Sequence, residues 1–326
     1  MSRGVSVAEV STAHLSLEAQ PVRQEIPSIT ATHLLKAISP DDLKQFMKSL
    51  PVADKHLVQG LAPTNPDRDR VILHLAAFYG DRRILKATKL VAKEPPENVH
   101  AMARGKLSSG GSFYYADLIL HVLAQAGISL PQRARVLDFG ASSGRVARVL
   151  KLYWTDAVIE GCDPNEAAIQ WARDNVPGVT FFVNPFLPPL PVKDRVYHLV
   201  YGISIWSHFG ERANIQWFAE MHRVLKPGGF LLFTFHGFNS IHHYATRGMH
   251  ELASMDETEH TLLRQGFSFA DIFGTAGDWG VVDADWGEAY FTLEWLLSRL
   301  TPDWILRYYR PGAAEGNQDI VILQAR

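Results

Sequence analysis

The sequence predicts an α/β fold, in which a doubly wound, mostly parallel seven-stranded sheet ends in an antiparallel C-terminal hairpin and follows a small helical N-terminal domain. Two observations predict this fold. From residue 110 onward, short apolar runs alternate with segments of helical apolar spacing, which is typical of βαβ units with helices on both faces of a parallel sheet. Before residue 110, helical spacing continues without a strand pattern.

The N-terminal third is expected to be a leader followed by helices. Residues 1–27 are polar and aperiodic, so we expect a flexible leader, and residues 28–109 are expected to form the helical domain. Ser39 followed by Pro40 and two acidic residues is a typical helix start. A later helix is expected over residues 81–96, up to its prolines, and the Ser- and Gly-rich residues 104–115 predict a flexible joint.

Residues 110–326 contain the alternating elements of the predicted sheet. Strands are expected at residues 134–140, 157–163, 178–184, 195–204, 228–237, 301–310 and 317–326. Helices are expected at residues 116–127, 144–154, 164–175 and 212–225. A Gly-rich turn joins the last two strands, so one of them should run antiparallel. The segment of about 237–291 is long for a connection, and we expect it to form a functional insert or cap.

Composition narrows the class of partner. The net charge is −2 and no block of like charges occurs, which argues against a nucleic-acid substrate. The single cysteine, Cys162, excludes an internal disulfide and a cysteine-based zinc site. No apolar run is long enough for a membrane span, and the first residues lack a signal core, so the expectation is a cytoplasmic protein without a membrane partner.

The strongest motif is VLDFGASSGRV, residues 136–146, in which a buried strand ends at Asp138 and turns through two glycines into a helix. Ligands of open α/β sheets bind at this carboxyl edge. The dinucleotide pattern G-x-G-x-x-G lacks its middle glycine here, and an acid before the loop would repel a pyrophosphate. The same acid suits a cationic ligand such as the amino group of a methionine moiety. A tight turn without a ligand is the alternative.

The second motif is Glu160-Gly161-Cys162-Asp163, in which Asp163 ends the next predicted strand. A carboxylate at this position can accept hydrogen bonds from both ribose hydroxyls of a nucleoside. Asp163 could instead be a helix N-cap, with Pro164 as the first helical residue and Glu166 as the third.

These motifs resemble those of the class I S-adenosylmethionine (SAM)-dependent methyltransferases, which have a Rossmann-like fold. DFGASSGR resembles their motif I and IEGCDPN their second motif, while LKPGGFLLFTFHG resembles the turn and fifth strand of the same fold. The resemblance covers about residues 110–236, and the motif sequences are most similar to those of a bacterial branch of small-molecule methyltransferases. Two departures are Ser142, in place of a middle glycine, and Asn184, where many members carry an acid that holds the adenine amino group.

The resemblance implies a set of contacts to SAM. Asp138 and Gly140 would face the methionine end, Asp163 the ribose, and Asn184 the adenine, where its amide oxygen could accept the same hydrogen bond as an acid. The other cofactor-binding residues that it implies are Ala141, Ser142, Gly144, Arg145, Pro164, Phe186, Ile203 and Ser204. Phe186 has a plain packing role as its alternative.

Histidines are the candidate catalytic residues, because histidine titrates near neutral pH and can remove a proton from an acceptor hydroxyl. His208 follows the fourth sheet strand and His236 ends the fifth, both at the carboxyl edge. Either could instead brace a loop. His242 and His243 are adjacent and no carboxylate stands at ligand spacing, so no metal site is expected.

Candidate acceptor contacts lie near the same edge. The insert repeats Asp-Trp-Gly twice, and Trp279 and Trp286 could stack on a sugar or an aromatic acceptor. His242 is a further candidate, and Tyr114 and Tyr115 could close over the cofactor. Each of these aromatic residues has packing as its alternative.

The predicted function is methyl transfer from SAM to a small-molecule acceptor, with a hydroxyl of a sugar or natural product preferred. An N-methyltransferase, a methyltransferase acting on RNA or protein, and a SAM-binding protein without catalysis are the alternatives. A nicotinamide dehydrogenase is disfavoured by the missing glycine. The acceptor and the oligomeric state are not determined by the sequence.

Overall fold

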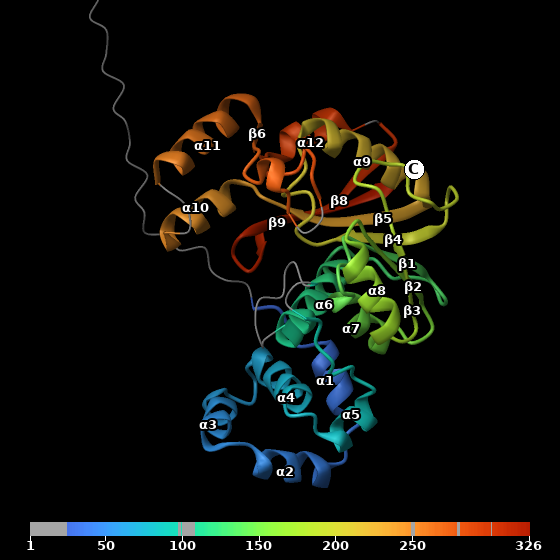
Figure 1. The fold of residues 1–326 in the computed structure, drawn as a ribbon, viewed down its shortest axis with the longest axis vertical. Coiled ribbons are helices and arrows are strands. Elements are labelled where there is room, and N and C mark those ends of the chain that lie inside the picture. The colour runs from blue at the N-terminus through green and yellow to red at the C-terminus, as the bar shows by residue number, and fades with distance from the viewer. Residues whose placement is uncertain (1–24, 97–98, 100–107, 249–251, 279–280, 301) are drawn as a thin grey trace, which may run out of the picture.

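The computed structural model describes residues 25–96, 99, 108–248, 252–278, 281–300 and 302–326. Within these ranges the chain forms a seven-stranded sheet covered by helices, with the N-terminal helices gathered at one end and the insert helices projecting at one side (Figure 1). The predicted α/β, Rossmann-like class is confirmed.

The sheet has the order β3-β2-β1-β4-β5-β9-β8. Its strands are β1 (Arg135–Phe139), β2 (Val158–Asp163), β3 (Val179–Val183), β4 (Tyr197–Gly202), β5 (Leu225–Phe235), β8 (Trp304–Ala314) and β9 (Gln318–Ala325). Strands β1 to β5 pair in parallel, and β9 pairs antiparallel with both β5 and β8. The prediction of one antiparallel strand from the terminal hairpin is therefore confirmed.

Side chains alternate between the two faces of the sheet, and each face has its own apolar core. On β1, Val136 belongs to the core beneath helices α6 (Ser108–Gln125), α7 (Arg145–Tyr153) and α8 (Glu166–Asn175). Its neighbour Leu137 belongs to the opposite core, beneath α9 (Glu211–Val224) and α12 (Leu293–Arg299). This two-sided burial explains why the strands read as short apolar runs rather than as alternating ones.

The N-terminal helices share the first of these cores. They are α1 (Thr30–Leu35), α2 (Pro40–Ser49), α3 (Val52–Gly60), α4 (Pro66–Phe78) and α5 (Arg82–Thr88). Buried residues of α1 and α4 belong to the same cluster as those of α6 and α7. A buried ion pair reinforces the contact, because Arg70 Nε on α4 lies 2.8 Å from Asp117 Oδ2 on α6. The predicted division of the chain near residue 109 stays a prediction.

Two local predictions were wrong. The helix expected over 81–96 ends at Thr88, because Lys89 takes a left-handed conformation with φ 57°. Residues 104–107 of the flexible joint expected at 104–115 lie outside the described residues, and the rest of it is helical from Ser108 onward. Phe113 is fully buried, and such apolar contact outweighs the low helix propensity of the neighbouring glycines. The helix start at Ser39 is confirmed, since its hydroxyl accepts the Asp42 N–H.

The insert folds over the carboxyl edge of the sheet. It contains α10 (Phe238–Arg247), α11 (Leu252–Gln265), a 3₁₀ turn at Gly274–Ala276, and a two-stranded antiparallel sheet of β6 (Phe267–Ala270) and β7 (Glu288–Phe291). Single β-bridges join Phe209 to Trp286 and His236 to Tyr290. In the described part of the chain, no helix combines the length and the apolar character needed to cross a membrane.

Candidate active site

The glycine loop after β1 is a tight turn between strand and helix. Gly140 and Gly144 have φ of 81° and 73°, which side chains rarely tolerate. The Gly140 and Ala141 amides both donate to the Cys162 carbonyl at 2.9 Å, so the loop is fastened to the end of β2. Gly144 is the N-cap residue of α7. The predicted strand-turn-helix is therefore present, and its backbone faces the carboxyl edge.

Asp163 joins this loop to the tip of β2. One carboxylate oxygen accepts the Ser142 N–H at 2.9 Å and the other accepts the Asn165 N–H at 2.8 Å. The alternative interpretation of Asp163 as the N-cap of α8 was wrong. Asn165 takes that place, because its side-chain oxygen accepts the Ala168 N–H. Burial raises the pKa of Asp163 to about 6, against the lowering effect of these two N–H donors.

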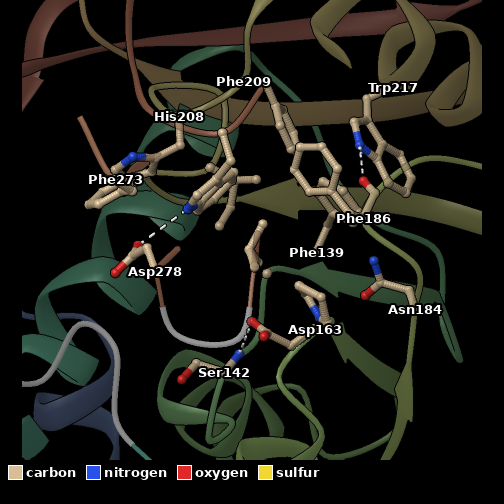
Figure 2. Close-up of a pocket in the computed structure, with 16 residues that line it drawn as sticks. Phe139, Ser142, Asp163, Asn184, Phe186, His208, Phe209, Trp217, Phe273 and Asp278 are labelled. Carbon is tan, nitrogen blue, oxygen red and sulfur yellow. Dashed lines mark hydrogen bonds between the residues drawn. The ribbon is translucent and has the colours of Figure 1, made fainter. Parts of the chain in front are cut away.

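A cavity of about 180 Å³ lies at the ends of β1 to β4. Figure 2 shows Asp163 and Asn184 on one side of it and His208, Phe273 and Asp278 on the other. The lining residues are Phe139, Gly140, Ser142, Asp163, Pro164, Asn184, Phe186, Ser204, Ile205, His208, Phe209, Trp217, Phe273, Asp278, Val281 and Trp286.

Asn184 presents a hydrogen-bond acceptor at the tip of β3. Its Nδ2 donates to the Pro185 carbonyl at 2.8 Å, which fixes the orientation of the amide. Its Oδ1 is buried and has no hydrogen-bond partner among the described residues. A buried acceptor without a partner costs free energy, and a ligand donor would remove that cost. An amino group on a flat heterocycle is such a donor.

Asp138 lies beside the cavity rather than in its wall. It is buried at the end of β1, and this burial raises its pKa to about 7; Tyr201 and Arg145 oppose the shift, and the nearby Asp163 adds to it. Ile205 fills the space in front of Gly140, because a Cβ built there would lie 2.1 Å from Ile205 Cδ1. The predicted contact between Asp138 and a ligand amino group therefore stays a prediction.

Arg145 and the two tyrosines form a separate cluster at the start of α7. The Arg145 guanidinium carbon lies 5.4 Å from the ring centre of Tyr115, and burial lowers the arginine pKa. Tyr114 Oη accepts the Glu315 N–H at 2.9 Å, which ties α6 to the β8–β9 turn. These three predicted residues are absent from the cavity wall, as are Ala141, Gly144, Ile203, His236 and His242.

His208 is the histidine that lines the cavity. Its Nδ1 lies 2.8 Å from the Gly287 carbonyl oxygen. Because a carbonyl only accepts, Nδ1 carries the proton and Nε2 is left as an acceptor. Burial lowers the His208 pKa, with smaller opposing effects from Gly287, Asp278 and Glu288. The ring is thus neutral near pH 7, which is the state that a general base needs.

His236 lies behind the cavity, in a buried network. Gln318 Nε2 donates to Ser204 Oγ at 2.7 Å and lies 3.0 Å from His236 Nε2. Thr234 Oγ1 donates to Gln318 Oε1 at 2.6 Å and accepts the Ser204 N–H at 2.8 Å. Ser204, with φ 61°, is the member of this network that lines the cavity. The geometry gives His236 a bracing position.

The insert supplies one wall of the cavity. Trp286, one of the two predicted tryptophans, lines it, and its indole N–H donates to Asp278 Oδ2 at 3.3 Å. Trp279 lies outside the described residues. His242 is on α10, where its carbonyl accepts the Thr246 hydroxyl.

Several lining residues were missed by sequence reasoning: Phe139, Ile205, Phe209, Trp217, Phe273, Asp278 and Val281. Asp278 carried a signal, because it begins the first Asp-Trp-Gly repeat. Phe273 and Trp217 carried none, since they reach the site only through the folding of the insert and of α9. Among the described residues, no three His, Cys, Asp or Glu side chains gather as a metal site would require.

Comparisons with known proteins agree with this geometry. The methyltransferase domain family matches residues 136–229. A malonyl-[acyl-carrier protein] O-methyltransferase of Geobacter sulfurreducens is 30% identical over 176 residues, which cover 48% of this chain and 63% of that protein. The chain thus spans less than two thirds of this relative.

Two further relatives act on different acceptors by name. A ribosomal protein L11 methyltransferase of Syntrophotalea carbinolica is 26% identical over 249 residues, covering 71% of this chain and 78% of the relative. A fatty-acid O-methyltransferase of Mycolicibacterium smegmatis is 28% identical over 144 residues, covering 44% of this chain and 49% of the relative.

Proposed function

Because this chain carries a class I SAM-dependent methyltransferase domain, we propose that it transfers the methyl group of SAM to a hydroxyl of a small-molecule acceptor. The observation that supports this most is the cavity at the ends of β1 to β4, where Asp163 and Asn184 line one half and His208 the other. Direct methyl transfer needs two adjoining binding sites, one for the cofactor and one for the acceptor.

The first half fits the nucleoside part of SAM. Asp163 carries carboxylate oxygens with lone pairs left to accept the ribose hydroxyls. The Asn184 Oδ1 atom, buried without a partner among the described residues, would accept from the adenine amino group. Pro164 and Phe186 would pack against the base. Asp138 would meet the methionine amino group, as the resemblance implies.

The chain's own contribution to the reaction is alignment and proton removal. SAM supplies an activated methyl on a sulfonium, so little covalent help is needed. His208 Nε2 would accept the proton of the acceptor hydroxyl as the oxygen attacks, while its Nδ1–H stays bound to the Gly287 carbonyl. The aromatic wall would exclude water from this exchange.

A binding measurement and a transfer assay test the proposal together. Calorimetry should detect SAM binding, and Asp163→Ala should weaken it by about 10- to 100-fold, since it removes charge-assisted hydrogen bonds. Asp174→Ala is the matched control, because Asp174 is exposed on α8 and contacts Gln170. Labelled-methyl transfer with mixed acceptors then reports catalysis. Absence of SAM binding by the unaltered chain would refute the proposal.

The alternatives are separable outcomes of the same assay. Transfer to amines alone would indicate an N-methyltransferase, and transfer to protein or RNA alone a macromolecular one. The relative that acts by name on ribosomal protein L11 keeps protein acceptors in the test. SAM binding without any transfer would indicate a binding protein.

A further inference from the structure

The acceptor half of the cavity has a distinct chemical character. We define the acceptor chamber as the six lining residues on the insert side: His208, Phe209, Phe273, Asp278, Val281 and Trp286. Five of the six present an aromatic, imidazole or aliphatic surface. The chamber is continuous with Phe186, which meets Trp286 edge-on, with a ring-centre distance of 6.0 Å and an interplanar angle of 88°.

The aromatic rings of the chamber hold one another in place. The Trp286 ring centre lies 4.8 Å from that of His208, with an interplanar angle of 33°, and 5.6 Å from that of Phe209 at 67°. The Phe273 ring centre lies 6.3 Å from that of His208. Flat rigid faces of this kind match a flat apolar ligand, because stacked and edge-on ring pairs add to the free energy of burial.

The polar atoms of the chamber are acceptors. The Trp286 indole N–H is already used by Asp278, and the His208 Nδ1–H is directed at the Gly287 carbonyl. What remains for a ligand, among the side chains that the structure describes here, is His208 Nε2 and the Asp278 carboxylate. A ligand must therefore offer donors. A sugar would bring more hydroxyls than these two groups can accept hydrogen bonds from, and a carboxylate would face the charge of Asp278.

We propose that the acceptor is a phenol, meaning a hydroxyl on an aromatic ring system, and that this ring stacks in the acceptor chamber with its hydroxyl at His208. This inference rests on the proposed methyl transfer. The phenolic O–H bond breaks and its proton passes to His208 Nε2. An oxygen–methyl bond forms as the carbon–sulfur bond of SAM breaks, with its electron pair left on sulfur. The products are a methyl ether, S-adenosylhomocysteine and an imidazolium that Asp278 neutralises.

The strength of the base agrees with this acceptor. Burial lowers the His208 pKa below its ordinary value, so His208 is a weak base. A phenolic proton has a pKa of about 10, as in tyrosine, whereas an aliphatic alcohol is nearer to water at roughly 15.7. Proton transfer from the phenol is therefore much less uphill.

A panel of defined acceptors tests the inference with the full chain and labelled SAM. The probes are a naphthol, a methyl glucoside, dodecanoate and a naphthylamine, at equal concentration. We expect methyl transfer to the naphthol at a rate at least 10-fold above the other three. Transfer that favours the glucoside, dodecanoate or naphthylamine would overturn the phenol assignment and leave the proposed methyl transfer standing. Loss of SAM binding would instead refute the proposed function itself.

A variant pair locates the binding site. Phe273→Ala should raise KM for the naphthol about 10-fold or more with little change in SAM affinity, because Phe273 is a half-buried loop residue of the chamber. Leu263→Ala is the control, since Leu263 is 67% exposed on α11 of the same insert and is absent from the cavity wall. Equal KM values in the two variants would place the ring elsewhere and overturn the inference.

Discussion

At the scale of residues, the candidate site contains two carboxyls whose ionisation opposes folding, Asp138 being buried and Asp163 half-buried. Burial raises the pKa of Asp138 to about 7 and that of Asp163 to about 6, well above the values of an unfolded chain. Each group therefore binds its proton more tightly in the folded state, so its contribution to stability decreases as pH rises through this range. A cationic ligand would instead favour the ionised form of both carboxyls.

This predicts a pH dependence of SAM affinity. Because SAM carries positive charge and ribose hydroxyls donate, binding should select the ionised carboxyls, and affinity should fall as pH decreases from about 7 through 6. Calorimetry in buffers of different ionisation enthalpy should detect proton release near pH 6.5. Affinity that stays constant from pH 5.5 to 8 would contradict the assignment of either acid.

Asp138→Asn separates stability from function. The amide removes a buried ionisable group, so the ligand-free variant should melt at or above the temperature of the unaltered chain at pH 8. The stabilisation that SAM adds should be lost, because the charge that meets the amino group is gone. Thermal melts with and without SAM measure both effects. A variant that keeps the full SAM shift would show that Asp138 does not meet the ligand.

His208→Asn tests the general base. The asparagine Nδ2 can still donate to the Gly287 carbonyl, but no acceptor replaces Nε2. We expect turnover to fall by roughly 10² to 10⁴, with SAM affinity within about twofold. The acid limb of the unaltered enzyme's rate profile should lie below pH 6.5, because burial lowers the His208 pKa. Full turnover in the variant would mean that the acceptor needs no base.

At the scale of elements, glycine is needed in the turn from β1 into α7 for two separable reasons, which a comparison of Gly140 with Gly127 separates. Gly140 lies in this turn, Gly127 lies after α6, and both have positive φ, 81° and 67°. A Cβ at Gly140 would collide with Ile205, whereas one at Gly127 meets nothing within 4 Å. An alanine at position 140 would therefore suffer both backbone strain and a steric collision, whereas an alanine at position 127 would suffer backbone strain alone.

The matched pair Gly140→Ala and Gly127→Ala measures the difference. Gly127→Ala should cost about 1–2 kcal/mol of unfolding free energy, the usual cost of a left-handed alanine, and leave SAM binding intact. Gly140→Ala should cost more and should weaken SAM binding, because Ile205 must shift in the cavity wall. Denaturant melts and calorimetry give both quantities. Equal costs would show that Ile205 accommodates the methyl.

The glycine loop and strand ends were predictable because they are local features. The turn signals and the acids lie within a few residues of their strands, so the pattern of residues 136–146 and Asp163 predicted strand ends that line the cavity. The helical extent of α6 was not predictable, because its glycines oppose a helix and only burial of Phe113 decides it. The capping of α8 was ambiguous, since Asp163 and Asn165 both fit a cap by residue type.

At the scale of the whole molecule, a buried ion pair fastens the N-terminal helices to the sheet domain. Asp117 on α6 accepts from Thr30 N, Thr30 Oγ1 and Arg70 Nε at 2.6, 2.7 and 2.8 Å. Burial raises the pKa of Asp117, and these donors oppose that shift. The helices thus share both an apolar core and a polar joint with α6.

Arg70→Met should therefore destabilise the whole chain by about 3–5 kcal/mol, because it leaves the Asp117 carboxylate buried without its cation. The double variant Arg70→Met with Asp117→Leu should recover part of that loss. Denaturant unfolding followed by circular dichroism and by SAM binding should give one coincident transition. Separate transitions would show that the N-terminal helices unfold independently.

The sequence by itself determined the fold class, the parallel strands with their antiparallel hairpin, and the strand tips that hold the glycine loop, Asp163 and Asn184, because strand period and turn chemistry are local. Only the tertiary structure decided which histidine faces the cavity. His208 and His236 both lie at the carboxyl edge of the sheet, but the hydrogen-bond network of Gln318 holds His236 behind the cavity. The bridge between Phe209 and Trp286 joins residues far apart in the chain, and it brings the insert over the cavity. No local pattern specifies that contact, since it depends on how the packed insert closes on the sheet.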